Sequence, residues 1–212
     1  MKYKNFKKTI ALLLTCVLAI GAAQVPANAC TTQYFAGSVA YNINNLGYQI
    51  MSSAQNTVLT LWVYHEAAWD FEEGGWNRIT KTNGTRMTNI EVMGSSGHIA
   101  PRTFLRVEGA SLNPNIFGQT GGFNANNQAV AVTANWNSAR ITMNSNVSVW
   151  GPTSEALATR QVRAAKTFMH EVGHTLKLND VSSNCTAVMR QAHVSALFVV
   201  NHDRNTLRAK WG

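Results

Sequence analysis

The segment from Glu155 to Leu176, EALATRQVRAAKTFMHEVGHTL, has the pattern of one long amphipathic helix. Its apolar residues recur at spacings of three and four, so they fall on one helical face: Val162, Ala165, Met169, Val172 and Leu176. Pro152-Thr153-Ser154 predicts the start of this helix, with Glu155 in its first turn. We therefore expect a helix of about six turns whose apolar face is buried in the core.

The remaining patterns predict an α/β (α+β) fold in which a twisted mixed sheet packs on two long helices. The first of these helices is expected over 49–71 and ends at Gly74-Gly75. Residues 94–127, rich in Gly, Asn, Ser and Pro, are expected to form long loops that hide a short strand such as IFGQTGG. Strand-like patterns cover 37–44, 76–82, 87–93, 128–136 and 139–150.

The N-terminal 29 residues have the pattern of a secretory signal peptide. Four lysines precede an apolar run from Ile10 to Ile20, and Ala27-Asn28-Ala29 resembles a cleavage site. The apolar run is roughly half the length of a membrane-spanning helix, which needs about 20 residues. We expect signal peptide 1–29 to be removed, leaving one extracellular domain, 30–212, with no membrane contact beyond export.

The charge of the exported chain excludes some partners. All four lysines before Ile10 leave with the signal and no acid does, so the formal charge falls from +8 to +4. The remaining basic residues are scattered without a run of like charge, so we expect no nucleic-acid partner. We expect a monomer.

Two cysteines, Cys30 and Cys185, remain after export. In an oxidising compartment two cysteines most simply pair, and we expect a disulfide between them. Two alternatives stay open: both residues are free thiols, or Cys30 carries a lipid at the new N-terminus.

The pentapeptide HEVGH, from His170 to His174, lies within the predicted second helix. Residues four apart differ by about 40° in direction, so both histidines point the same way and can share a metal ion. Glu171 is rotated by about 100° from His170, which suits a general base acting on a zinc-bound water rather than a ligand. A chance occurrence of this short pattern remains an alternative.

A protein zinc site usually needs a third ligand. Few residues after His174 can supply it: Asp180, Asp203, His193 and His202. No glutamate follows Glu171, which excludes zinc proteases whose third ligand is a glutamate on a later helix. Asp180 can reach the metal if the helix ends near Lys177 and the chain folds back, whereas Asp203 or His202 would need a longer return path.

HEVGHTLKLND (170–180) resembles the H-E-x-x-H-x-x-G-x-x-H/D signature of the metzincin zinc proteases, in the variant with a third aspartate found in snapalysin-like bacterial enzymes. The resemblance implies zinc bound by His170, His174 and Asp180, with Met189 in a methionine turn beneath the metal. Lys177 stands at the family's glycine. A left-handed lysine costs about 1–2 kcal/mol, unless Asn179 takes part of the bend.

These features predict a secreted zinc endopeptidase acting on protein or peptide substrates. By resemblance, an exposed strand edge within 116–136 would bind the extended substrate, and either IFGQTGG or QAVAVTANW could supply that edge. We expect no structural calcium. The alternative is a secreted metal-containing binding protein on the same scaffold, with weak or no catalysis.

Overall fold

A computed structural model describes residues 30, 32–69, 75–81, 83–94, 103–181, 185–190 and 199–212. The predicted signal peptide, 1–29, lies outside these residues. The helices are α2 (Leu61–Trp69), α3 (Leu157–Thr175) and α4 (Asn201–Trp211), with 3-10 turns η2 (Ile43–Asn45), η3 (Ser52–Ala54), η4 (Trp76–Arg78) and η5 (Val147–Trp150). The strands are β1 (Leu46–Ile50), β2 (Ile90–Gly94), β3 (Thr103–Ala110), β4 (Gly118–Phe123), β5 (Ala129–Val130) and β6 (Ser138–Asn144).

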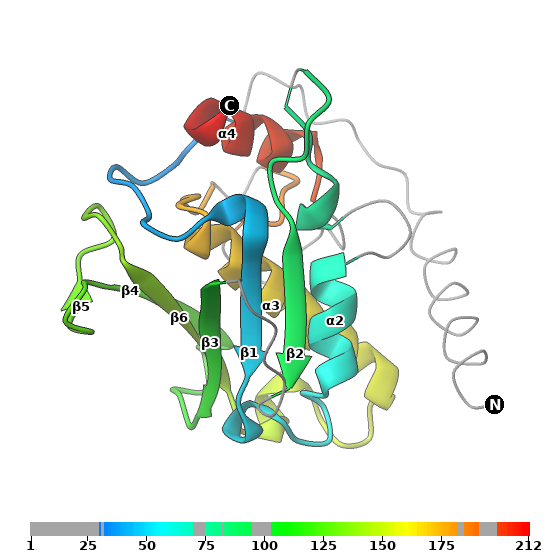
Figure 1. The fold of residues 1–212 in the computed structure, drawn as a ribbon. Helices are drawn as coiled ribbons and strands as arrows, with labels where there is room; N and C mark the ends of the chain where they lie inside the picture. Colours follow the sequence, from blue (N-terminus) through cyan, green and yellow to red (C-terminus); the bar gives the residue numbers. More distant parts are fainter. Residues whose placement is uncertain are drawn as a thin grey trace.

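The strands form one six-stranded mixed sheet in the order β2-β1-β3-β6-β4-β5 (Figure 1). The first four strands of this order are parallel to one another, and β4 runs antiparallel to both of its neighbours. β5 pairs only with Gly122 and Phe123 of β4. Within the described residues, the outer edge of Gly118–Gly121 therefore has no strand beside it.

Helices α2 and α3 pack on the same face of the sheet. Phe168 of α3 meets Tyr48 of β1 and Tyr64 of α2 edge to face, with ring centroids 5.7 Å and 4.9 Å apart. The side chains that face these helices alternate along the strands and are buried, as on β1 at Leu46, Tyr48 and Ile50. This confirms the coarse expectation of a mixed sheet packed on helices, with α3 behind β1 in Figure 1.

The first helix differs from its prediction over 49–71. The apolar residues at 46, 48 and 50 recur every second position and belong to β1, so a strand occupies the start of the predicted range. The chain then turns at Asn56, whose Oδ1 accepts from the N–H groups of Val58 and Leu59. Helix α2 begins only at Leu61, and Thr60 Oγ1 accepts from the Val63 N–H in its first turn.

The predicted strands vary in how well they match. Strand β2 lies at the end of 87–93, β4 overlaps the suggested IFGQTGG segment, and β6 forms the first part of 139–150. The expectation of loops over 94–127 missed β3, eight residues that alternate about the buried Leu105 and Val107. Three strand predictions were largely wrong, because 37–44, 76–82 and 128–136 hold mainly turns, isolated bridges and the short β5.

Helix α3 confirms the long helix predicted for 155–176, but its start differs. Ala156 precedes the first turn and makes no side-chain cap, so the cap expected at 152–154 is absent there. The Glu155 carboxylate bonds instead to the guanidinium of Arg163 on the second turn of the helix. None of the helices in the described parts of the chain has the length and apolar character needed to cross a membrane.

Candidate metal centre

Both histidines of HEVGH are oriented by backbone carbonyl groups. His170 Nδ1 lies 2.8 Å from the carbonyl oxygen of Val188, and His174 Nδ1 lies 2.9 Å from that of Leu178. A carbonyl oxygen only accepts, so each Nδ1 must carry the proton and donate. In the neutral form of each ring, Nε2 is then unprotonated and carries a free electron pair, which is the form of histidine that binds metal.

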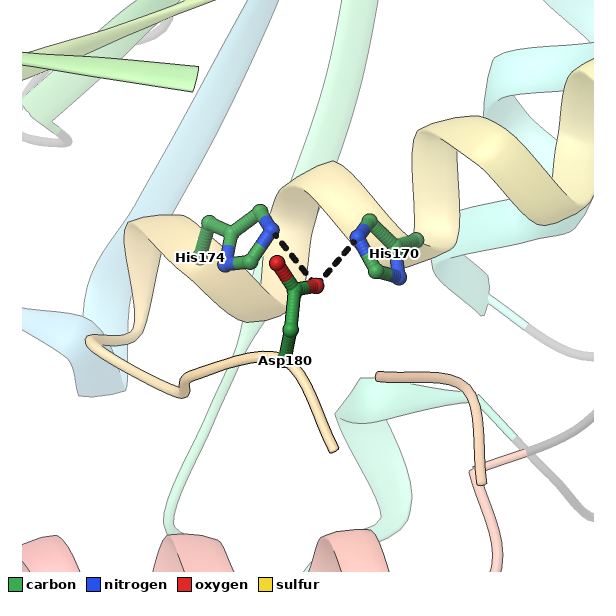
Figure 2. Close-up of side chains that lie close together, drawn as sticks. All are labelled: His170, His174 and Asp180. Atoms are coloured by element: carbon green, nitrogen blue, oxygen red, sulfur yellow. Dashed lines mark ion pairs between the residues drawn. The ribbon is translucent and has the colours of Figure 1, made fainter. Parts of the chain in front are cut away.

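Asp180 completes a group of three electron-pair donors. Its Oδ1 lies 3.1 Å from His170 Nε2 and 3.5 Å from His174 Nε2, and Figure 2 shows the carboxylate between the two rings. This oxygen is buried and has no hydrogen-bond partner. Three electron pairs that converge on one point repel one another unless a cation lies among them.

The donor set fits zinc. In a tetrahedral site with zinc bonds of about 2.0–2.1 Å, neighbouring donor atoms lie about 3.3 Å apart. The distances from Oδ1 to the two Nε2 atoms lie on either side of that value, and the three donor atoms all lie within 4.8 Å of one another. Two imidazoles and one carboxylate leave one tetrahedral position open, which is the pattern of catalytic rather than structural zinc sites.

The protonation of the group reflects the same convergence. Burial alone would raise the pKa of Asp180, but in the metal-free protein the adjacent His170 and His174 rings outweigh burial and hold that pKa well below its usual range. Burial alone would lower the pKa of His170, but the contact with Asp180 and the charge of Glu171 raise it above its ordinary value. Without a metal, protons take the place of the cation.

The turn that brings Asp180 back to the histidines is a Schellman motif at the end of α3. The Leu178 N–H donates to the Gly173 carbonyl and the Lys177 N–H donates to the His174 carbonyl, at 3.0 Å and 2.9 Å. Lys177 takes the left-handed conformation, with φ of 66°, which confirms the bend expected at this position. Asn179 does not share it, since Asn127 is the one other non-glycine residue with positive φ in the described ranges.

Lys177 is fully buried, and its side-chain contacts explain how a lysine is held in this left-handed conformation. Its Nζ donates to the carbonyl oxygens of Val132 and Ala134, at 2.7 Å and 2.6 Å. The same ammonium lies 3.8 Å from the centroid of the Trp136 ring, within the range of a cation–π contact. These contacts offset the backbone cost and tie the turn at the end of α3 to the loop between β5 and β6.

Glu171 lies between α3 and β4. It is 4% exposed, and Thr120 Oγ1 donates to its Oε2 at 2.7 Å and to its backbone carbonyl at 3.1 Å. The neighbouring Gly118 leaves room for this arrangement, because a Cβ there would lie 3.0 Å from Glu171 Cγ. The carboxylate is therefore held against β4, whose outer edge has no strand beside it at Gly118–Gly121 within the described residues.

Met189 packs directly under the helical turn that carries both histidines. A Cβ added to Gly173 would lie 2.1 Å from Met189 Sδ and 2.9 Å from Trp76 Cζ2. A glycine inside a helix costs about 0.5–1 kcal/mol relative to alanine, so it commonly marks a close contact. Gly173 was thus a readable signal for this contact, which lies where the resemblance expected a methionine turn.

Asp203 holds the backbone at Val188 and Met189 in place and is not one of the three converging donors. Its Oδ2 accepts from the N–H groups of Val188 and Val200, and its Oδ1 accepts from that of Met189. Asp203 is fully buried, so both of its oxygens are used in positioning the backbone that orients His170. His202 also lies outside the group of three donors, and His193 lies outside the described residues.

The N-terminal segment runs beside the metal-site turn. Phe35 N–H donates to the Lys177 carbonyl, Asn179 N–H donates to that of Gln33, and a disulfide joins Cys30 to Cys185. The pairing of these cysteines is thus the arrangement in this structure, in which Cys185 is buried. The Phe35 ring lies 6.0 Å from the ring of His174, which closes one side of the site.

The sequence was compared with models of known protein families, and none matches. A search of curated proteins also returned no match. The chemical case for this site therefore rests on its own residues and geometry.

Proposed function

We propose that this protein is a secreted zinc-dependent endopeptidase with a metzincin-like fold, in which His170, His174 and Asp180 hold the metal. The observation that carries the proposal is the convergence of two Nε2 atoms on a buried Oδ1 that has no hydrogen-bond partner. Glu171 directly follows the first of these histidines in the sequence. A structural zinc site would be closed by a fourth protein ligand. Among the described residues only these three form such a group.

Each residue has a role in the proposed hydrolysis. Zinc, when bound, supplies a Lewis acid that polarises a peptide carbonyl and makes water more acidic. Glu171 is the proposed general base, which takes a proton from the attacking water and passes it to the leaving amine. Thr120 holds the Glu171 carboxylate by its hydrogen bond, and this restricts the rotamers from which the base can act.

The outer edge of β4 is the proposed substrate-binding strand. Residues Gly118–Gly121 have unpaired backbone groups on that side within the described chain, and an extended peptide can add to such an edge. Thr120 lies in this stretch and contacts Glu171, so a peptide bound there would lie close to the proposed base. Of the two segments left open by the sequence, this favours IFGQTGG over QAVAVTANW.

The test is cleavage of a quenched fluorescent casein by the purified protein, beside Glu171→Gln, with the zinc content of both measured. We expect one zinc per chain in both proteins, cleavage by the parent, and a loss of activity of about 100-fold or more in the variant. Thr167→Ala is the matched control. Its hydroxyl donates to the Arg163 carbonyl on the same helix, so its loss leaves the proposed chemistry in place.

Two outcomes would contradict the proposal. Zinc in both proteins with no cleavage of any unfolded substrate would favour a metal-containing binding protein without catalysis. The near-complete burial of Glu171 is the observation that favours this second candidate. A folded parent that binds no zinc would reject the metal centre itself.

A further inference from the structure

A row of polar side chains crosses the face of the sheet opposite α3. The strand register places Gln49, Arg106, Arg140 and Gly121 next to one another on β1, β3, β6 and β4 (strands labelled in Figure 1). The residues on either side of Arg106 and Arg140 in their strands are Leu105, Val107, Ala139 and Ile141, all buried in the hydrophobic core. Because strand side chains alternate, the two arginines point away from the metal centre.

The two arginines are paired across neighbouring parallel strands and are incompletely neutralised. The Arg106 side chain is exposed and makes no hydrogen bond or ion pair within the described chain. Arg140 lies 4.6 Å from the Phe123 ring centroid, and its Nε is 3.6 Å from Glu108 Oε1. Among the described residues Glu108 is the one acid paired with them, so these three side chains together keep a net positive charge. Phe123 holds the Arg140 guanidinium in place by stacking.

A cavity of about 260 Å³ opens at this pair. Its lining adds a hydroxyl and an amide to the two guanidinium groups, from Ser138 and Asn127. The volume is several times the roughly 30 Å³ that one water occupies, and below most drug-sized pockets of about 300 Å³ or more. It suits a small ligand.

We propose that this cavity binds a phosphate or sulfate group. Each guanidinium presents five N–H donors in a rigid fork and no acceptor, so two adjacent forks favour an anion with several oxygens. Neighbouring strands lie about 4.8 Å apart, and a tetrahedral oxyanion can accept from both forks at that spacing while a third oxygen accepts from Ser138 or Asn127. The site is separate from the proposed zinc centre and does not depend on it.

The test is calorimetric titration of the purified protein with sodium phosphate, sodium sulfate and phenyl phosphate, against sodium chloride at the same ionic strength. Arg106→Gln and Arg140→Gln each remove one guanidinium group. Arg86→Gln is the matched control, because it removes an exposed arginine that precedes β2, at the other edge of the sheet. The exposed Arg106 side chain makes no hydrogen bond or ion pair within the described chain, so we expect Arg106→Gln to fold. This variant alone can test the proposal if Arg140→Gln is unstable.

We expect the parent and Arg86→Gln to bind the anion. The dissociation constant should be raised about 10-fold or more in Arg106→Gln and in Arg140→Gln. Tighter binding of phenyl phosphate than of the inorganic ion would support an organic ester as the ligand, and equal binding would support the free ion. Absence of anion binding by the parent would overturn the proposal. Equal binding by all four proteins would also overturn it, because general charge attraction or the metal centre would then explain the heat.

Discussion

Met189 Sδ packs so closely against Gly173 that any side chain at position 173 would overlap it, at 2.1 Å from the added Cβ. Gly173 lies one residue before His174 on α3, and Met189 lies one residue after Val188, whose carbonyl orients His170. The contact therefore fixes the spacing between the helix that carries the histidines and the turn beneath it. It is the packing contact on which the geometry of the proposed metal site depends.

Gly173→Ala should lower the free energy of unfolding by about 1–3 kcal/mol, the usual cost of overpacking a core. Alanine is the better helix former by about 1 kcal/mol, so any net loss reports the clash with Met189. Urea denaturation of the parent and the variant measures the change. Gly94→Ala is the control, since its new methyl would meet only Leu61 Cδ2 at an ordinary 3.7 Å.

The double variant Gly173→Ala with Met189→Ala separates this clash from a change in helix propensity. Removing the Met189 side chain makes room for the new methyl. The double variant should therefore lose less free energy of unfolding than the two single variants lose together, with a coupling of about 0.5–3 kcal/mol. Simple additivity would show that the two side chains do not compete for the same space.

Lys177→Met should destabilise the protein by about 1–3 kcal/mol, because two carbonyl oxygens lose their donor while the left-handed backbone stays. Lys177→Gly should cost less than its lost contacts suggest, since glycine relieves about 1–2 kcal/mol of backbone strain. Denaturant unfolding of both variants tests the balance. A Lys177→Gly protein more stable than the parent would show that the contacts of the buried ammonium contribute less than the backbone strain costs.

The same residue predicts a pH dependence. Burial, and to a smaller extent the charge of Lys210, lowers the pKa of Lys177 from 10.5 to about 8. Between these values the unfolded chain binds more protons than the folded one, so the stability of the parent should rise with pH across that window. Lys177→Met should lack this rise. Unfolding of both proteins in EDTA, from about pH 7 to pH 10, measures the difference.

The sequence predicted the parts of the site that depend on local periodicity. His170 and His174 lie on one helix and Asp180 follows within six residues, so a spacing argument reaches all three. Thr120 and Asp203 lie 51 and 15 residues from their partners, Glu171 and Val188, and no local pattern signals such contacts. Strand β3 was missed for a similar reason: from Leu105 to Ala110 its buried residues are Leu105 and Val107, too few to outweigh the loop-like composition around them.

Asp203→Asn should lower zinc affinity by about 10- to 100-fold, the usual effect of losing an outer partner of a metal ligand. The amide can accept at only one of the two oxygens now used, so the turn at Val188 should shift and the support of His170 should weaken. Competition with a fluorescent chelator measures the affinity. His202→Gln, one residue away on α4, should bind zinc like the parent. A lower zinc affinity in this variant would indicate that His202 is itself a ligand.

Replacement of both cysteines by serine should lower the free energy of unfolding by about 2–5 kcal/mol, because the disulfide closes a loop of 155 residues. Both must be changed together so that no free thiol remains. Thermal unfolding of the double variant and of the parent with and without reductant provides the comparison. A reductant that leaves the parent unchanged would contradict the pairing of Cys30 with Cys185.

Asp180→Asn should reduce zinc affinity more than any outer-partner substitution, by well over about 100-fold. The change keeps the size of the side chain and removes its charge, so the two histidines would face a neutral amide in place of a carboxylate. Zinc content after dialysis measures the loss. Glu155→Gln, which removes an acid that is paired with Arg163 away from the site, is the control. Full zinc content in Asp180→Asn would show that another residue is the third ligand.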